Sequence, residues 1–167
     1  MEIIKITVPA LIVFLTVYYL MKTHSRQMIT LESMKLKKDA ASTTLPLRLQ
    51  AYERLALFCE RISPDNLLLR FRKENMSGKD LQNLLVLAIK QEYDHNLTQQ
   101  IYVSESLWNI IQLCKDRILE LIYAAGKAKD ADNPDVFSNI LIKAFEETNP
   151  VKTAQRAIRK EVQLYFD

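Results

Sequence analysis

The chain has 167 residues, of which 49% are hydrophobic and 26% are charged, and its formal net charge is +3. This length allows one domain with a buried core plus an additional segment. Two glycines are too few for a phosphate-binding or dinucleotide-binding loop, and the Gly-x-Ser-x-Gly motif of serine hydrolases is absent. The two cysteines, Cys59 and Cys114, fall in apolar helical patterns, which indicates small buried side chains rather than a disulfide or a metal cluster.

The first predicted element is an N-terminal membrane anchor. Residues 6–21 carry no charge, and the apolar stretch reaches nineteen residues from Ile3 if Lys5 extends its amine to the surface. A transmembrane helix needs about 20 such residues. A cleaved signal peptide or an interfacial segment is the alternative, but no small-residue cleavage site follows the Tyr-Tyr-Leu-Met end of the stretch. We therefore predict an uncleaved transmembrane helix over residues 1–22.

A basic juxtamembrane segment and linker follows over residues 23–44. The basic residues beside the anchor on its C-terminal side are Lys22, Arg26, Lys35, Lys37 and Lys38, whereas the N-terminal flank has Lys5 alone. The positive-inside rule therefore predicts an outside N-terminus and a cytoplasmic C-terminal domain. These basic side chains either contact anionic lipid headgroups or only set this topology. Residues 39–44 are small and polar, which predicts a linker after a short helix at 27–38.

The charge balance separates this segment from the rest of the chain. Residues 1–44 hold six of the 23 basic and three of the 20 acidic residues, which leaves seventeen of each for residues 45–167. Nucleic-acid binding needs a basic face for phosphate contacts, so a neutral domain is a poor candidate. We therefore expect no nucleic-acid partner.

Residues 45–167 are predicted to form an all-α antiparallel bundle of about five to six helices. Helix starts are marked by Ser63, Asn133 and Asn149, each followed by proline, and by Ser77 as a capping residue; Gly126 marks a helix end. Apolar residues recur at helical spacing, for example at Leu107, Ile111, Cys114, Ile118, Leu121 and Ala125. The predicted helices cover 46–62, 64–74, 78–102, 105–125, 134–148 and 150–166.

The break between the third and fourth helices is not marked by a helix-breaking residue, because residues 79–125 contain neither glycine nor proline. The apolar stripe that begins at Leu81 does not continue in register into the stripe of the next helix, so a straight uninterrupted helix would aim the two at different neighbours. Ser104 is a plausible N-cap after such a break. A turn at residues 94–96 and a single kinked helix are the alternatives.

The polar segment QEYDHNLTQQIYVS, residues 91–104, is the candidate site. Glu92 and His95 have the Glu-x-x-His spacing of helical di-iron sites, but such sites need two of these pairs. The other histidine, His24, lies near the anchor, so a metal-dependent enzyme would require a homodimer. The segment could instead be a bundle end, which needs hydrogen-bonding side chains. The third possibility is a protein-binding patch of Tyr93, His95, Gln99, Gln100, Tyr102 and Trp108.

The chain also resembles a known family. Besides the anchor, the resemblance rests on LPLRLQAYERL at residues 45–55, RISPDNLLLR at 61–70, the polar segment at 91–104 and Trp108. These residues are similar to those of an uncharacterised family of small membrane-anchored proteins from Bacteroidota. The resemblance implies a location in a Gram-negative inner membrane, and no reaction, ligand or partner comes with it. We expect a non-enzymatic module for protein interaction or scaffolding, without a cofactor; the alternative is the dimeric metal enzyme.

Overall fold

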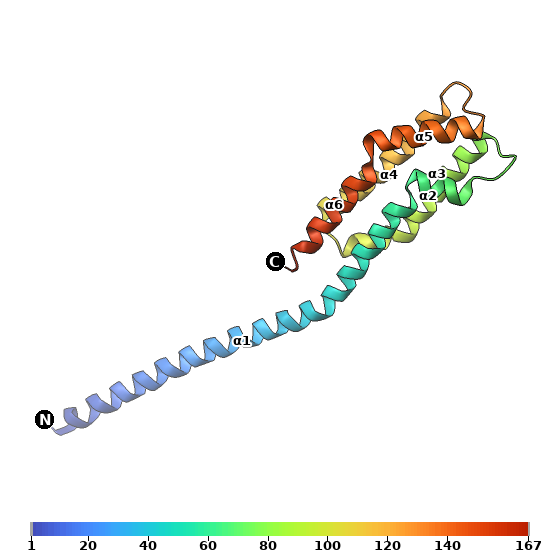
Figure 1. The fold of residues 1–167 in the computed structure, drawn as a ribbon. Helices are drawn as coiled ribbons and strands as arrows, with labels where there is room; N and C mark the ends of the chain where they lie inside the picture. The colour runs from blue at the N-terminus through green and yellow to red at the C-terminus, as the bar shows by residue number, and fades with distance from the viewer. Residues whose placement is uncertain (1, 167) are drawn as a thin grey trace. The chain divides into compact units, whose positions relative to one another are not determined.

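The computed structural model describes the backbone of residues 2–166 (Figure 1). Its side chains are described at 14–24, at Met28, Lys35 and Ser42, and over residues 44–166. The elements are α1 (Glu2–Arg61), α2 (Pro64–Phe71), α3 (Gly78–Asn96), the 3-10 helix η1 (Leu97–Ile101), α4 (Glu105–Gly126), α5 (Pro134–Thr148) and α6 (Pro150–Gln163). Residues 2–166 contain no strand. The all-α prediction is confirmed.

The chain divides into two compact units, Met1–Pro46 and Leu47–Asp167, and helix α1 runs through the boundary between them. Residues 39–44, predicted as a linker, are helical in α1. Two alanines and the absence of glycine and proline make this stretch compatible with a helix. Pro46 was expected at a helix start and instead lies inside α1, where it supplies no backbone N–H to the preceding turn.

In the first unit, the described side chains at 14–24 are all exposed, among them Tyr18 and Tyr19. The amine of Lys22 lies 5.9 Å from the ring centroid of Tyr18. The first thirteen side chains of the predicted anchor, and those of Arg26, Lys37 and Lys38, lie outside the described residues. Among the residues that are described, no helix combines the length and the hydropathy needed to cross a membrane.

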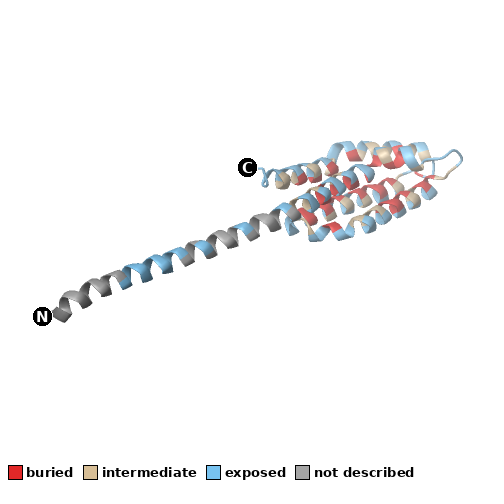
Figure 2. Ribbon diagram, turned by 90° about the horizontal axis from the view of Figure 1, so that it is seen from below, coloured by how far each residue is buried: buried red, intermediate tan, exposed pale blue. Residues whose placement is uncertain are grey.

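The second unit is a helical bundle with a continuous core (Figure 2). Helix α4 packs against α3, α5 and α6, and α2 packs against α3 and α5. The largest side chains that are fully buried are Phe58, Phe137, Leu55, Ile62, Leu67, Leu81, Leu85, Ile89, Leu107, Ile111, Ile118 and Ile122. Cys59 and Cys114 are free and buried, as their apolar context predicts. A hydrogen bond with Cys114 and burial both raise the pKa of Cys59, which keeps its thiol protonated.

The predicted caps mostly act as expected. The Ser77 hydroxyl accepts a hydrogen bond from the Asp80 amide at 3.1 Å, and Asn133 and Asn149 accept one each at the starts of α5 and α6. Ser63 makes no such bond to its helix; its hydroxyl donates to the carbonyl oxygen of Glu60 at 2.8 Å. Helix α2 ends at Phe71, three residues before the predicted end, and α6 ends at Gln163 rather than at residue 166.

Candidate functional site

The polar segment folds into the end of α3, the 3-10 helix η1 and a short turn. Asn96 is the last residue of α3, and its side-chain amide donates to the carbonyl oxygen of Glu92 at 2.7 Å. The Ser104 hydroxyl then accepts from the Leu107 amide at 3.1 Å, so Ser104 is the N-cap of α4 as predicted. The third and fourth helices are therefore separate. The α-helical geometry ends near the alternative turn at 94–96, and the chain continues as η1 to residue 101.

Glu92 is held by two arginines from other helices. Its carboxylate lies 3.4 Å from the Arg61 guanidinium on α1 and 3.6 Å from that of Arg70 on α2, and its side chain is 12% exposed. Arg61 and Arg70 are therefore the charged partners of Glu92. Two guanidinium groups repel a metal cation from this carboxylate.

His95 lines a small cleft together with Arg61 and Glu92 of this ion pair. The cleft has a volume of about 280 Å³ and is lined by Arg54, Leu57, Phe58, Arg61, Glu92, His95 and Asn96. His95 is exposed, and the lining adds arginines rather than further carboxylates around it. Among the described residues, no three His, Cys, Asp or Glu side chains come together as a metal site would require. The pair Glu92 and His95 thus fits an ion-paired bundle surface better than half of a di-metal site.

Tyr93 packs inward rather than outward. Its ring stacks on Trp108 with centroids 5.7 Å apart, and its hydroxyl accepts from the Gln112 amide at 3.1 Å. The Lys115 amine lies 4.4 Å from the Tyr93 ring centroid, a cation–π geometry. These contacts join α3 to α4. Tyr93 therefore serves the packing of the bundle.

The predicted protein-binding patch is only partly at the surface. Gln99 and Trp108 are 8% and 7% exposed, so neither offers its side chain to a partner. Their helical positions turn them into the bundle, where Trp108 joins the core. His95 and Gln100 are exposed, and Tyr102 is half-buried. The structure does not gather the six predicted residues into one surface.

A second polar cluster, not predicted from the sequence, centres on Glu161 of α6. Its carboxylate accepts from the Tyr52 hydroxyl at 2.9 Å, from the Ser104 amide at 2.8 Å and also from the Ser104 hydroxyl. Tyr165 lies beside Tyr52 with its hydroxyl 3.5 Å away, and the Arg48 guanidinium donates to that hydroxyl. This Glu161 cluster connects α1, the start of α4 and the C-terminal turn, which comprises residues 164–166.

The Glu161 cluster makes the free energy of unfolding depend on pH in the alkaline range. Burial, the hydrogen bonds with Tyr165 and Glu161, and the charge of Glu161 all raise the pKa of Tyr52 above its usual 10. Below pH 10 the contribution of Tyr52 is fully present, and above it the unfolded chain loses a proton that the folded chain keeps. We expect the free energy of unfolding to fall as the pH rises above about 10, with a smaller fall in Tyr52→Phe. Denaturant unfolding followed by Trp108 fluorescence measures this, with exposed Tyr123→Phe as control. Equal slopes in all three proteins would contradict it.

An apolar groove runs along α4 beside the start of α6. It has a volume of about 660 Å³, and its apolar lining includes Ile110, Leu113 and Pro150. Leu113 is 67% exposed, and the Arg117–Glu120 ion pair, with oxygen and nitrogen 2.7 Å apart, lies on the rim. The core stripe of α4 includes Ile111, Cys114 and Ile118, and Leu113 lies outside it. An apolar residue outside the core stripe was the sequence signal for a second apolar face on this helix.

Comparison with known proteins gives one match. Residues 1–165 match DUF7935, a family of unknown function. No curated protein and no solved structure matches the chain. The match covers nearly the whole sequence, from the N-terminal segment to the C-terminal turn, and agrees with the resemblance to an uncharacterised family. The chain belongs to DUF7935, a family of unknown function.

Proposed function

We propose that this chain is a non-enzymatic helical module that is anchored in the inner membrane and binds another protein through the groove along α4. The observation that carries the proposal is the combination of Leu113, 67% exposed, with an apolar groove of about 660 Å³. Exposed apolar surface of this kind marks sites of protein interaction. The Arg117–Glu120 pair on the rim supplies charges of both signs for orienting a partner.

The form of the groove favours a helical ligand. An amphipathic helix binds by placing its apolar face in a groove between helices and its polar face toward solvent. Ile110 and Leu113 are three residues apart on α4, and Pro150 opens α6 opposite them. The partner would thus be a protein segment with apolar residues at helical spacing.

The membrane anchor is proposed on the sequence. The apolar stretch from Ile3 to Met21 has about the length that a bilayer requires. The basic residues that follow it, including Lys22 and Lys35, favour a cytoplasmic bundle with the N-terminus outside. In this arrangement the bundle presents its groove to cytoplasmic proteins at the membrane surface.

The alternative, a metal enzyme assembled across a homodimer, is favoured less by the contacts of Glu92 than a protein-binding module. It required Glu92 and His95 to be free to bind a cation. Arg61 and Arg70 instead neutralise the Glu92 carboxylate from two other helices. A cation at this position would have to displace both guanidinium groups.

In-cell photocrosslinking tests the groove. A photoreactive residue placed at 113 in the full chain is expected to yield one discrete adduct in the membrane fraction. A charged residue in an apolar interface is strongly unfavourable, so Leu113→Lys, with the photoreactive residue moved to position 110, is expected to reduce that adduct roughly tenfold. Leu87, which is 51% exposed on α3, provides the matched control, since Leu87→Lys leaves the groove intact.

Three results would contradict the proposal. An equal loss of adduct in Leu113→Lys and Leu87→Lys would show that the effect is not specific to the groove. A soluble full chain, recovered outside the membrane fraction, would refute the anchor. An adduct with the mass of two copies would assign the groove to self-association in place of another protein.

A further inference from the structure

Four large apolar side chains are exposed at one end of the bundle. Leu47, Ile101, Leu164 and Phe166 are 45%, 71%, 73% and 68% exposed. They come from three separate segments, the first turn of the second unit, η1 and the C-terminal turn. We call these four residues the bundle-end patch.

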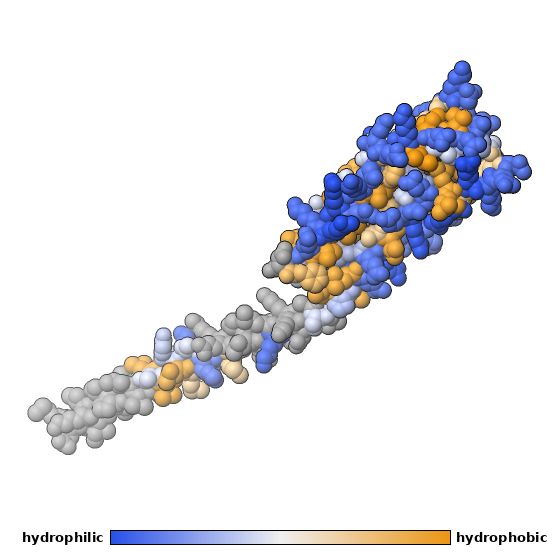
Figure 3. Space-filling model, viewed as in Figure 1, coloured by the Kyte–Doolittle hydropathy of each residue, from blue (hydrophilic) through white to orange (hydrophobic). Residues whose placement is uncertain are grey.

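The Glu161 cluster holds the three segments at the same end. Ser104, just after η1, donates its amide to Glu161 at 2.8 Å, and Tyr52, on α1, donates its hydroxyl at 2.9 Å. Arg48 bonds to Tyr165, which lies between the two apolar residues of the C-terminal turn. Figure 3 shows hydrophobic side chains gathered at this end of the bundle, beside the C-terminus.

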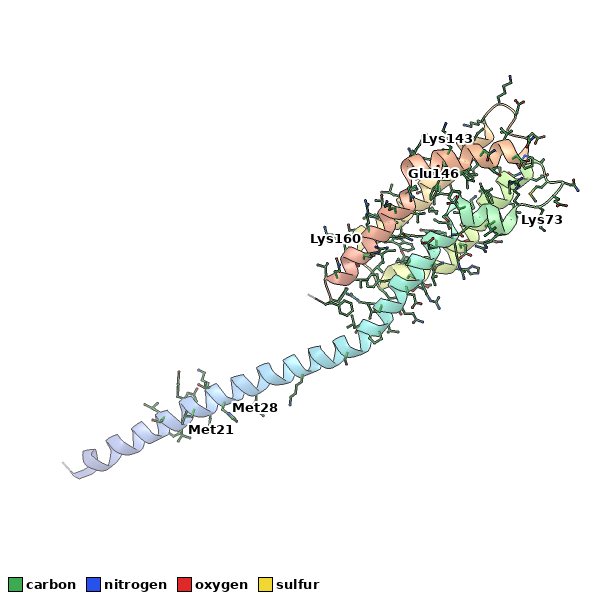
Figure 4. The ribbon with its side chains drawn as sticks, in the orientation of Figure 1. Met21, Met28, Lys73, Lys143, Glu146 and Lys160 are labelled. Atoms are coloured by element: carbon green, nitrogen blue, oxygen red, sulfur yellow. The ribbon has the colours of Figure 1, made fainter. Side chains whose placement is uncertain are left out.

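The side chains around the patch have the chemistry of a membrane interface. Tyr102 and Tyr165 add aromatic rings with polar tips, which favour the headgroup region of a bilayer. The Arg48 guanidinium lies 5.5 Å from the Tyr165 ring centroid, and Lys160 is exposed on the last turn of α6 (Figure 4). These cations suit anionic headgroups.

The acidic residues near this end are accounted for. The Glu161 carboxylate already accepts hydrogen bonds from Tyr52 and Ser104. Glu53 on α1 and Glu105 at the start of α4 are exposed, so the end carries both signs of charge. Binding would therefore depend on apolar insertion, with Arg48 and Lys160 adding an electrostatic contribution.

We infer that the bundle-end patch docks on the anionic surface of the membrane that holds the anchor. This inference rests on the proposed anchor, because the chain enters the bundle at Leu47, which is itself part of the patch. The 24 residues between the anchor and Leu47 are helical in α1, so they limit the separation to about 36 Å. Such a tether makes docking an intramolecular event and raises the effective concentration of lipid at the patch.

Quenching by brominated lipid tests the docking. The full chain is reconstituted in vesicles of equal parts phosphatidylglycerol and phosphatidylcholine with brominated acyl chains. Tryptophan is introduced as Phe166→Trp in the patch or as Leu69→Trp on α2, where Leu69 is 84% exposed. The parent chain, with Trp108 alone, gives the background. If the patch inserts, the brominated lipid is expected to quench the Phe166→Trp emission at least roughly twofold more than the Leu69→Trp emission. In vesicles of brominated phosphatidylcholine alone, the quenching of Phe166→Trp is expected to be weaker.

The outcomes separate the two proposals. Equal quenching of the two variants in chains that remain with the vesicles would overturn the docking and leave the anchor standing. Chains that do not remain with the vesicles would refute the anchor, and the inference with it. A third outcome would also contradict the docking. If the Phe166→Trp emission is not quenched by brominated lipid, and the chain is dimeric both in vesicles and in detergent, the patch faces a second copy of the chain.

Discussion

Replacing Gly78 with alanine is expected to lower the free energy of unfolding of the bundle by about 3 kcal/mol. Gly78 opens α3, and its amide donates to the carbonyl oxygen of Asp132 at 2.6 Å. A Cβ at this position would lie 1.9 Å from the carbonyl oxygen of Ala131. Because the obstacle is backbone, it cannot rotate away, and the loop between α4 and α5 would have to shift.

Gly126 provides the matched control. A Cβ there would meet the side-chain amide of Gln82, with the closest atom at 2.3 Å, and a flexible side chain can move. Gly126 also lies at the end of α4, where alanine favours the helix by up to about 1 kcal/mol. We therefore expect Gly126→Ala to change the free energy of unfolding by less than about 1 kcal/mol in either direction.

Thermal unfolding of the full chain, followed by Trp108 fluorescence, distinguishes the two variants. The buried indole reports on the bundle alone. A loss of about 3 kcal/mol corresponds to a fall in Tm of roughly 10 °C for a domain of this size. Parent-like unfolding of Gly78→Ala would mean that the loop at 131–132 has room to move, contrary to the close approach in the structure.

Local sequence signals predicted the helix starts well. Ser77, Ser104, Asn133 and Asn149 each cap the helix expected of them, because a cap depends on residues within one turn. The core stripe of α4 was also predictable, since its spacing is a local property of the helix. Most of the bundle's secondary structure therefore follows from the sequence.

The linker predicted at residues 39–44 and the helix start predicted at Pro46 differ from the structure for one physical reason. A proline fits the first turn of a helix and is tolerated less well inside one, so Pro46 favoured a start over continuation. The residues before it, at 39–44, are small and polar, which is compatible with either a linker or a helix. Local preference alone could not decide between them, and the structure continues α1 through both.

The candidate site depended on contacts between distant segments, which spacing does not reveal. The partners of Glu92 are 31 and 22 positions away along the chain, on α1 and α2. The partners of Glu161 come from α1 and from the turn before α4, more than fifty positions away. Periodicity places a residue on a face of its helix, but it does not identify which helix that face meets.

Glu161→Ala is expected to lower the free energy of unfolding by roughly 2 kcal/mol. The substitution removes the acceptor of the Tyr52 hydroxyl, which is part-buried, and of the Ser104 amide at the start of α4. Hydrogen bonds to a charged acceptor contribute more than neutral ones, and half-exposure of Glu161 reduces the value toward the lower end. Lys160→Ala, one position away and exposed, is the control and is expected to have little effect.

A double-mutant cycle shows whether the cluster acts as a unit. Tyr52→Phe removes one of the bonds that Glu161 accepts, so its cost should be smaller in the Glu161→Ala background than in the parent. Denaturant unfolding monitored by Trp108 gives the four free energies. Additive costs would mean that the Tyr52–Glu161 bond contributes nothing. Coupling would show that the Glu161 carboxylate joins α6 to α1 and contributes to the stability of the bundle end.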